Sequence, residues 1–333
     1  MKRALVTGAS GFIGRHLVRA LQADGWQVEA LVRTTSNIAD LEGCALVVGD
    51  LTEPETLRPA MAHVDAVFHL ASLLKVPWRA DFAPVNVEGT RAVAAACAAA
   101  ARPPVLVVVS SMAATGPALE GRPRVESDPP APVSRYGRVK RAAELAAAEF
   151  ADRVPLTIVR PPMVFGEGDR GALPLFRGVV GGWHLVPTRA ARRIGLVHAA
   201  DLSVGLIAAA RRGARLPGGD GASGAAGIYF IAAPETPTYA ELGRQIAEAA
   251  DAAVRVVHLP SPVTRVAATL GEWSARLRDR PSVLNVDKYR EAVAGDWICD
   301  VSRARSELGW RPTAPLAVRI RQTIDGYRAA GWL

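Results

Sequence analysis

Thr7-Gly8-Ala9-Ser10-Gly11-Phe12-Ile13-Gly14 lies between a short apolar run, Ala4–Val6, and a helical pattern that begins at Phe12. Gly8 permits a tight turn, Gly11 lets backbone N–H groups approach a pyrophosphate, and Gly14 allows the helix to pack against the strand. The N-terminus of that helix would face the phosphates. Glycine is common in turns of many kinds, so the cluster alone does not identify a binding site. Its position directly after a strand and before a helix predicts a dinucleotide site.

Short apolar runs alternate with helical patterns through the first half of the chain. The runs lack polar alternation, which predicts strands buried on both faces. Parallel strands need crossover helices, so the alternation predicts an α/β fold, a doubly wound parallel sheet of the Rossmann type. The expected strands are Ala4–Val6, Val28–Val32, Leu46–Val48, Ala66–His69, Val105–Val109 and Leu156–Val159, and the expected helices are Phe12–Ala23, Pro54–Ala62, Val87–Ala101 and Arg135–Ala151.

The second half is less regular and predicts a smaller C-terminal substrate-binding region. Glycine-rich segments at 178–182 and 218–227 separate its helical patterns, which are Leu202–Arg211, Tyr239–Ala249, Pro262–Arg278 and Ala314–Ala329. The predicted division gives residues 1–165 to an NAD(P)-binding Rossmann domain, to which 195–235 return. Residues 166–194 and 236–333 form the predicted substrate-binding lobe.

Composition is that of an ordinary globular protein. Half of the 333 residues are hydrophobic and 22% are charged. The net charge of +8 comes from scattered arginines without basic runs or interleaved aromatic residues, so we expect no nucleic-acid partner. Three distant cysteines, Cys44, Cys97 and Cys299, indicate neither a disulfide framework nor a zinc site, and we expect no metal. No stretch reaches the ~18 apolar residues of a membrane span, and the N-terminal apolar stretch is too short for a signal peptide, so we expect a cytoplasmic protein with no integral membrane segment.

The end of the second predicted strand bears on the choice between NAD and NADP. An NAD site places a carboxylate there for the ribose hydroxyls, but this strand ends Leu31-Val32-Arg33-Thr34. A guanidinium at Arg33 suits a 2′-phosphate, which favours NADP while leaving NAD possible. Asp50 and Leu51, just after the third strand, are placed to meet the adenine.

A tyrosine and a lysine one helical turn apart predict acid–base chemistry. Tyr136 and Lys140 are i and i+4 on one helical face. A free phenol has a pKa of about 10, and a nearby ammonium together with the positive nicotinamide ring is expected to lower it. Tyr136 could then exchange a proton with a ketone or alcohol oxygen while hydride moves to or from the ring. Ser110 and Ser111 follow the fifth strand at the sheet edge where ligands bind, so a hydroxyl there can orient the substrate.

With these motifs the chain resembles the extended short-chain dehydrogenases/reductases, the group of nucleotide-sugar epimerases, dihydroflavonol-type reductases and 3β-hydroxysteroid dehydrogenases. The likeness covers almost the whole length. Besides the glycine motif and Tyr136-x-x-x-Lys140, it rests on five ordered segments: His69–Ser72, Asn86–Thr90, Arg160–Gly166, Leu196–Leu202, and Asp300–Ala304 leading into Glu307–Trp310.

The resemblance implies a catalytic set and a cofactor lining. Ser111, Tyr136 and Lys140 would form the triad, with Ser111 chosen over Ser110 because it stands five residues before Gly116. Lys140 would also hold the nicotinamide ribose, and Asn86 would support the site. A homodimer through the helices beginning near Asn86 and Arg135 is expected. From the motifs and the resemblance together, we expect the cofactor to contact Thr7, Gly8, Ser10, Gly11, Phe12, Ile13, Gly14, Arg33, Asp50, Leu51, Leu70, Ala71, Ser72, Ser110, Tyr136, Lys140, Pro161, Met163 and Val164.

Departures from related enzymes narrow the reaction. Dehydratases of this type carry Thr-Asp-Glu after the fifth strand, whereas this chain has Ser111-Met112-Ala113. Epimerases hold a nucleotide diphosphate with an arginine that is Ile194 here, although Arg192 and Arg193 could substitute. Members that have lost the triad serve as cofactor sensors or assembly subunits, but here the triad is complete.

We therefore predict hydride transfer between NADP, with NAD possible, and a secondary alcohol or ketone of a bulky, mostly apolar, sterol-like or flavonoid-like substrate. The alternative is a nucleotide-sugar 4-epimerase with tightly bound NAD. The candidate pocket residues are Trp78, Phe82, Trp183, Leu185 and Trp273. The apolar stripe Val263, Val266, Leu270, Trp273 and Leu277 predicts a packed lid helix, with docking to a membrane surface as the alternative.

Overall fold

The computed structural model describes residues 2–73, 83–119, 121–218, 225–278 and 285–333. Within these ranges, seven parallel strands form the central sheet in the order β10-β6-β5-β4-β1-β2-β3. The strands are β1 (Arg3–Thr7), β2 (Gln27–Val32), β3 (Ala45–Val48), β4 (Ala66–His69), β5 (Val105–Val109), β6 (Leu156–Arg160) and β10 (Ile228–Phe230). The chain reverses direction across the sheet between β1 and β4, the place where doubly wound folds bind ligands. The predicted Rossmann-type fold is confirmed.

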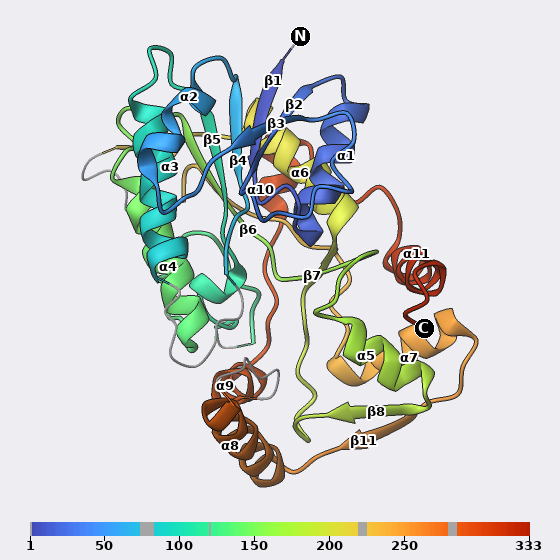
Figure 1. Ribbon diagram of the computed structural model, residues 1–333. Coiled ribbons are helices and arrows are strands. Elements are labelled where there is room, and N and C mark those ends of the chain that lie inside the picture. Colours follow the sequence, from blue (N-terminus) through green and yellow to red (C-terminus); the bar gives the residue numbers. More distant parts are fainter. Residues whose placement is uncertain (1, 74–82, 120, 219–224, 279–284) are drawn as a thin grey trace.

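Helices cover both faces of this sheet (Figure 1). One face carries α1 (Phe12–Ala23), α6 (Ala199–Arg212) and α10 (Ser302–Leu308), and the other carries α2 (Arg58–Met61), α3 (Gly89–Ala98) and α4 (Arg135–Ala148). Alternate residues of a strand point to opposite faces, so Ala4 and Val6 pack under α1 and α6 while Leu5 packs under α2 and α3.

The first half departs from the sequence prediction at three places. β3 is an edge strand rather than one buried on both faces, and Leu46 and Val48 are 45% and 63% exposed. The predicted helix 54–62 divides into a 3₁₀ turn, η1 (Pro54–Thr56), and the single turn α2, because Pro59 has no N–H to continue an α-helix. The helix predicted from Val87 starts instead as a π turn, η2 (Pro84–Glu88), ahead of α3.

A third core lies beside the sheet, where α5 (Leu173–Val180), α7 (Tyr239–Ala250) and α11 (Leu316–Ala329) pack together through Phe176 and Ile246, among other residues. Gly178 belongs to α5, so the segment 178–182 does not separate helices as predicted. The short strands outside the first half are not predicted from the sequence, because three or four residues show no clear periodicity. Besides β10 these are β7 (Met163–Phe165), paired with β9 (Leu196–His198), and β8 (Trp183–Val186), paired with β11 (Arg255–His258).

Two further helices, α8 (Ser261–Arg278) and α9 (Val286–Ala294), lie together at the end of the molecule opposite to the N-terminus (Figure 1). The predicted packing of the α8 stripe is wrong, because all five of its side chains are exposed: Val263 by 52%, Val266 by 60%, Leu270 by 65%, Trp273 by 62% and Leu277 by 85%. Trp183 and Leu185 are exposed as well, while Trp78 and Phe82 lie outside the described residues. None of the described helices is both long enough and apolar enough to span a bilayer. The division into two lobes stays a prediction.

Candidate active site

The glycine turn between β1 and α1 is built so that only glycine fits. Gly8 has φ +72°, and a Cβ there would lie 2.7 Å from the Ala71 nitrogen. A Cβ on Gly14 would lie 2.1 Å from the Gly8 carbonyl oxygen. The N-cap of α1 is Gly11, which has no side chain to bond the first N–H groups of the helix. These N–H groups are therefore available to an anion, as a pyrophosphate requires.

A buried hydrogen-bond chain joins this turn to the end of β4. The Thr90 hydroxyl donates to the Asn86 carbonyl at 2.7 Å, so it accepts from His69 Nε2 at 2.9 Å. His69 Nδ1 then accepts from the Thr7 hydroxyl at 2.8 Å, and Thr7 Oγ1 accepts from the Ala71 N–H at 3.3 Å. Burial lowers the pKa of His69 to about 3, so the ring is neutral. This series of hydrogen bonds fixes the Ala71 backbone against Gly8.

The Asn86 side chain holds the next part of the same segment. Its Oδ1 accepts from the Leu73 N–H at 2.7 Å, and its Nδ2 donates to the Leu73 carbonyl at 2.9 Å. Between Ala71 and Leu73 lies Ser72, whose hydroxyl oxygen is buried and has no hydrogen-bond partner among the described residues. Asn86 therefore positions the segment expected to line the nicotinamide, and Ser72 offers that segment an unused polar group.

Ser111 and Tyr136 meet where the end of β5 faces the start of α4. Ser111 caps the 3₁₀ turn η3 (Met112–Ala114), and its Oγ accepts from the Ala113 N–H at 3.1 Å. Ser134 caps α4 by accepting from the Gly137 N–H at 3.0 Å. A Cβ on Gly137 would lie 2.3 Å from the Ala113 carbonyl oxygen, so glycine permits the close approach of α4 to η3. The Tyr136 and Ser111 side chains are hydrogen-bonded.

The ionisation of the predicted pair differs from the sequence expectation. Burial raises the pKa of Tyr136 to about 12, although the bond with Ser111 acts to lower it. Burial also lowers the pKa of Lys140 to about 8, although Glu144 acts to raise it. The Lys140 ammonium donates to the Val109 carbonyl at 2.8 Å. Lys140 does not contribute to the shift of the phenol, so the expected lowering of the Tyr136 pKa by Lys140 does not occur.

A buried carboxylate, which the sequence did not single out, stands beneath this pair. Glu144 lies one helical turn after Lys140, and Arg160 at the end of β6 donates to both of its oxygens, at 2.7 and 2.6 Å. Ser110 donates to it at 2.5 Å and Arg141 at 2.9 Å. The Ser110 hydroxyl therefore uses its hydrogen on Glu144. The i+4 spacing from Lys140 was the one available signal.

The remaining predicted cofactor residues lie along the same sheet edge. Arg33 directly follows β2 and is exposed. Hydrogen bonds from Thr52 lower the pKa of Asp50, and the charge of Arg33 lowers it further, which places these two groups within electrostatic reach. Leu51 is buried in the core beside α2 and α3. The Pro161 carbonyl accepts from the Met112 N–H at 2.8 Å. Leu70, Met163 and Val164 are partly buried and pack against the hydrophobic cores.

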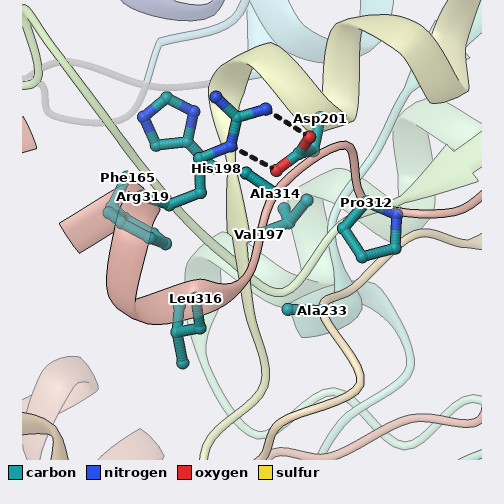
Figure 2. A pocket seen from close by; sticks show the side chains of 9 residues that line it. All are labelled: Phe165, Val197, His198, Asp201, Ala233, Pro312, Ala314, Leu316 and Arg319. Atoms are coloured by element: carbon teal, nitrogen blue, oxygen red, sulfur yellow. Dashed lines mark hydrogen bonds and ion pairs between the residues drawn. The ribbon is translucent and has the colours of Figure 1, made fainter. Parts of the chain in front are cut away.

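A small cavity seen in Figure 2 lies elsewhere, and none of the predicted site residues lines it. It is formed by β7, β9, and the starts of α6 and α11, where Arg319 donates to both carboxylate oxygens of Asp201. Asp201 also accepts from the Thr313 hydroxyl at 2.7 Å, so these groups already satisfy one another and hold α11 to α6. No cluster of metal-ligating side chains occurs among the described residues.

The glycine cradle, the uncapped start of α1 and the orphaned Ser72 hydroxyl all fit a dinucleotide. Sequence comparison agrees, because the NAD dependent epimerase/dehydratase family matches residues 4–220. The chain belongs to this family. It is an NAD(P)-dependent oxidoreductase of the extended short-chain dehydrogenase/reductase type.

Relatives of this family member cover its full length. It is 34% identical to the ceramide reductase of Caulobacter vibrioides over 98% of this chain and 95% of that protein. It is 32% identical to the 4-hydroxy-2-methyl-3-oxo-4-farnesyl-3,4-dihydroquinoline-1-oxide ketoreductase of Stigmatella aurantiaca, over 99% of this chain and 96% of that protein. The crystal structure of gox2253 superimposes with a TM-score of 0.79 at 25% identity and covers all of both chains.

Proposed function

We propose that this family member uses NADPH to reduce a ketone carried by a bulky, lipid-like substrate. The observation that carries the proposal is that the Tyr136 hydroxyl is hydrogen-bonded to Ser111, with Lys140 one helical turn after Tyr136. Burial raises the pKa of Tyr136 to about 12. A phenol with this pKa is protonated at neutral pH. It can therefore give a proton to a carbonyl oxygen, as the reduction of a ketone requires.

The roles of the chain's own groups follow from their contacts. Bound nicotinamide supplies the hydride. Tyr136 donates the proton to the developing alkoxide, and the Ser111 hydroxyl, held by η3, orients the same oxygen. The Lys140 ammonium, anchored on Val109, keeps a positive charge close to the developing negative oxygen. Asn86 acts through Leu73 and positions the segment expected to face the nicotinamide.

The apolar, lipid-like substrate is supported by the relatives. One is named for ceramide, and the other for a dihydroquinoline oxide that carries a farnesyl chain. Both names describe reductases, and both proteins match this chain from end to end. A polar nucleotide sugar carries neither a ceramide nor a farnesyl group.

Preference for NADPH rests on Arg33. The side chain is exposed at the sheet edge beside the glycine turn, where β1 and β2 run parallel with Thr7 opposite Leu31. An exposed guanidinium there can bind a 2′-phosphate bidentately. Arg33→Ala is expected to weaken NADPH binding about tenfold or more with little change for NADH, because a charge-assisted bidentate contact is worth at least that factor. Equal weakening of both would contradict phosphate recognition.

The second candidate, a nucleotide-sugar 4-epimerase, is favoured by Arg192. Its Nε is buried and has no hydrogen-bond partner among the described residues, so it could serve a diphosphate. The neighbouring Arg193 is already bonded to the Thr236 hydroxyl at 2.5 Å. Mass spectrometry of the nucleotide that co-purifies, with NADPH and NADH titrations, separates the two functions. Loosely held cofactor, NADPH preference and oxidation of NADPH by long-chain ketones support the reductase. Stoichiometric, non-exchanging NAD supports the epimerase.

We also propose a homodimer formed through α3 and α4. An exposed apolar side chain on α4, Leu145, supports this contact. Leu145→Glu should convert the dimer to a monomer in light scattering, and a wild-type monomer would contradict the proposal. A cytoplasmic location is proposed with it, because NADPH is supplied there.

A further inference from the structure

The outward face of α8 is apolar although nothing in the described chain covers it. Thr264 and Ala268 are buried and mark the face that packs inward. With 100° per residue, the five exposed apolar side chains fall on the opposite face over four turns of the helix. The outward stripe consists of Val263, Val266, Leu270, Trp273 and Leu277.

Positive charge accompanies this stripe. From Arg255 to Arg278 the sequence has four arginines, at 255, 265, 276 and 278, and one acidic residue, Glu272. The Glu272 carboxylate accepts from the Val286 N–H at 3.2 Å, so it turns inward to the start of α9. Arg265 is exposed beside the stripe. Among the described side chains, the surface therefore combines apolar groups with the cations Arg255 and Arg265 and lacks an exposed carboxylate.

The preceding strands extend the same character. Trp183 and Leu185 are exposed on β8, and the Arg255 guanidinium lies 5.8 Å from the centre of the Trp183 ring. β11 leads through Leu259 and Pro260 directly into α8, and all these elements lie at the end of the molecule away from the N-terminus (Figure 1). Tryptophan and arginine side chains that lie next to one another are typical of a lipid–water interface.

This surface is connected to the candidate active site through α9. The Asp287 carboxylate on α9 accepts from the Arg135 N–H at 2.9 Å, and Arg135 is the residue before Tyr136. The charge of Glu291, also on α9, reaches Tyr136 and acts to raise its pKa. The inner helix of the α8–α9 pair thus contacts the start of the catalytic helix, while the outer helix presents the apolar stripe to the outside.

We propose that the α8 stripe docks on the surface of an anionic lipid bilayer and so brings the active site to a substrate that resides in the membrane. This docking surface adds a location to the proposed function, and the identity of the membrane-resident substrate rests on that function. Anionic headgroups complement the arginines. A second copy of the chain fits less well, because pairing two such surfaces would bring their arginines together with no exposed carboxylate among the described side chains to offset them.

The test is co-sedimentation of the full chain with vesicles of phosphatidylcholine, with and without phosphatidylglycerol and free of any ketone. The expected result is binding that requires phosphatidylglycerol and weakens with salt. The double variant Leu270→Glu, Trp273→Glu should bind at least about tenfold more weakly, because burial of one leucine is alone worth that factor. Both side chains are exposed, so the fold should be unaffected. Val318→Glu, an exposed valine on α11, is the matched control and should bind like the wild type.

Several outcomes would overturn the proposal: no sedimentation of the wild type, equal binding to neutral vesicles, or equal loss in the α11 control. A change from dimer to monomer in the α8 variant, with vesicle binding unchanged, would assign the stripe to a second copy instead. Reduction of a short, water-soluble ketone should be equal in wild type and variant. Vesicle binding without any ketone reduction would refute the proposed function and leave the docking surface in place. Ketone reduction without vesicle binding would refute the docking surface and leave the proposed function in place.

Discussion

Replacing Glu144 with glutamine removes the negative charge from a group of buried side chains between α4 and the end of β6. Glu144 and Arg160 are each 1% exposed, and Arg160 bonds both carboxylate oxygens. Removing one partner of such a pair leaves the other charge buried without compensation, which costs about 3–5 kcal/mol. Against a total stability of roughly 5–15 kcal/mol this is a large loss. Urea denaturation followed by tryptophan fluorescence would measure it.

Glu149→Gln is the matched control at the end of the same helix. Its carboxylate pairs with Arg91 at 2.8 Å, but both side chains are substantially exposed, so the expected loss is about 0–1 kcal/mol. The reasoning is refuted if the two variants are equally stable at neutral pH.

The loss should also depend on pH in a defined direction. Burial acts to raise the pKa of Glu144, but the charge and hydrogen bonds of Arg160 and its other donors outweigh burial, and the pKa is lowered. A carboxylate with a lowered folded pKa stabilises the protein fully above its ordinary value of 4.5 and loses this contribution as the pH falls through the folded pKa. The gap between wild type and Glu144→Gln should therefore close in acid.

The same variant should move the alkaline limb of activity. The pKa of Lys140 is lowered to about 8 by burial and is supported by the charge of Glu144. Ketone reduction by the wild type should fall as the pH rises through about 8 and the ammonium is lost. In Glu144→Gln this fall should occur at lower pH, and an unshifted profile would show that Glu144 does not act on Lys140.

Tyr136→Phe should lower the rate of reduction at least about 100-fold while NADPH still binds, which single-turnover kinetics and fluorescence titration would separate; retained turnover would exclude Tyr136 as the proton donor. Asn86→Ala removes both side-chain bonds to Leu73 and should destabilise the chain by about 2 kcal/mol in urea while raising the Kd for NADPH, and an unchanged Kd would mean that the segment keeps its position alone. Gly8→Ala places a Cβ 2.7 Å from the Ala71 nitrogen and should weaken NADPH binding at least about tenfold in the same titration, whereas wild-type affinity would show that the turn can relax.

Local signals gave the elements of the first half well. Phe12–Ala23, Ala66–His69 and Val105–Val109 have the bounds that the sequence predicts. A glycine precedes the helix, two prolines precede Val105, and each of the two short runs forms one complete strand. β10 could not be found in this way. Its three residues become a strand only by pairing with β6, which precedes them by a long stretch of chain.

The candidate site divides in the same manner. Spacing along one helix identified Tyr136 and Lys140, and the structure places Ser111 in contact with that tyrosine. Spacing could not reveal that Glu144 is bonded from the ends of two different strands, since Ser110 and Arg160 meet it only in the folded chain. Nor could it determine that burial, rather than Lys140, controls the phenol of Tyr136.

The strand order has a consequence for how the chain is made. β1, the first strand of the sheet in chain order, lies in the interior of the sheet between β4 and β2, and β2 to β6 then add one at a time to an open edge beside a neighbour already synthesised. Until β6 arrives, β5 is an unpaired edge with four buried apolar residues, the kind of edge that joins other chains into aggregates. Fragments that end after β5 or β6 should therefore precipitate on expression, and a soluble truncation has to extend at least through Phe230.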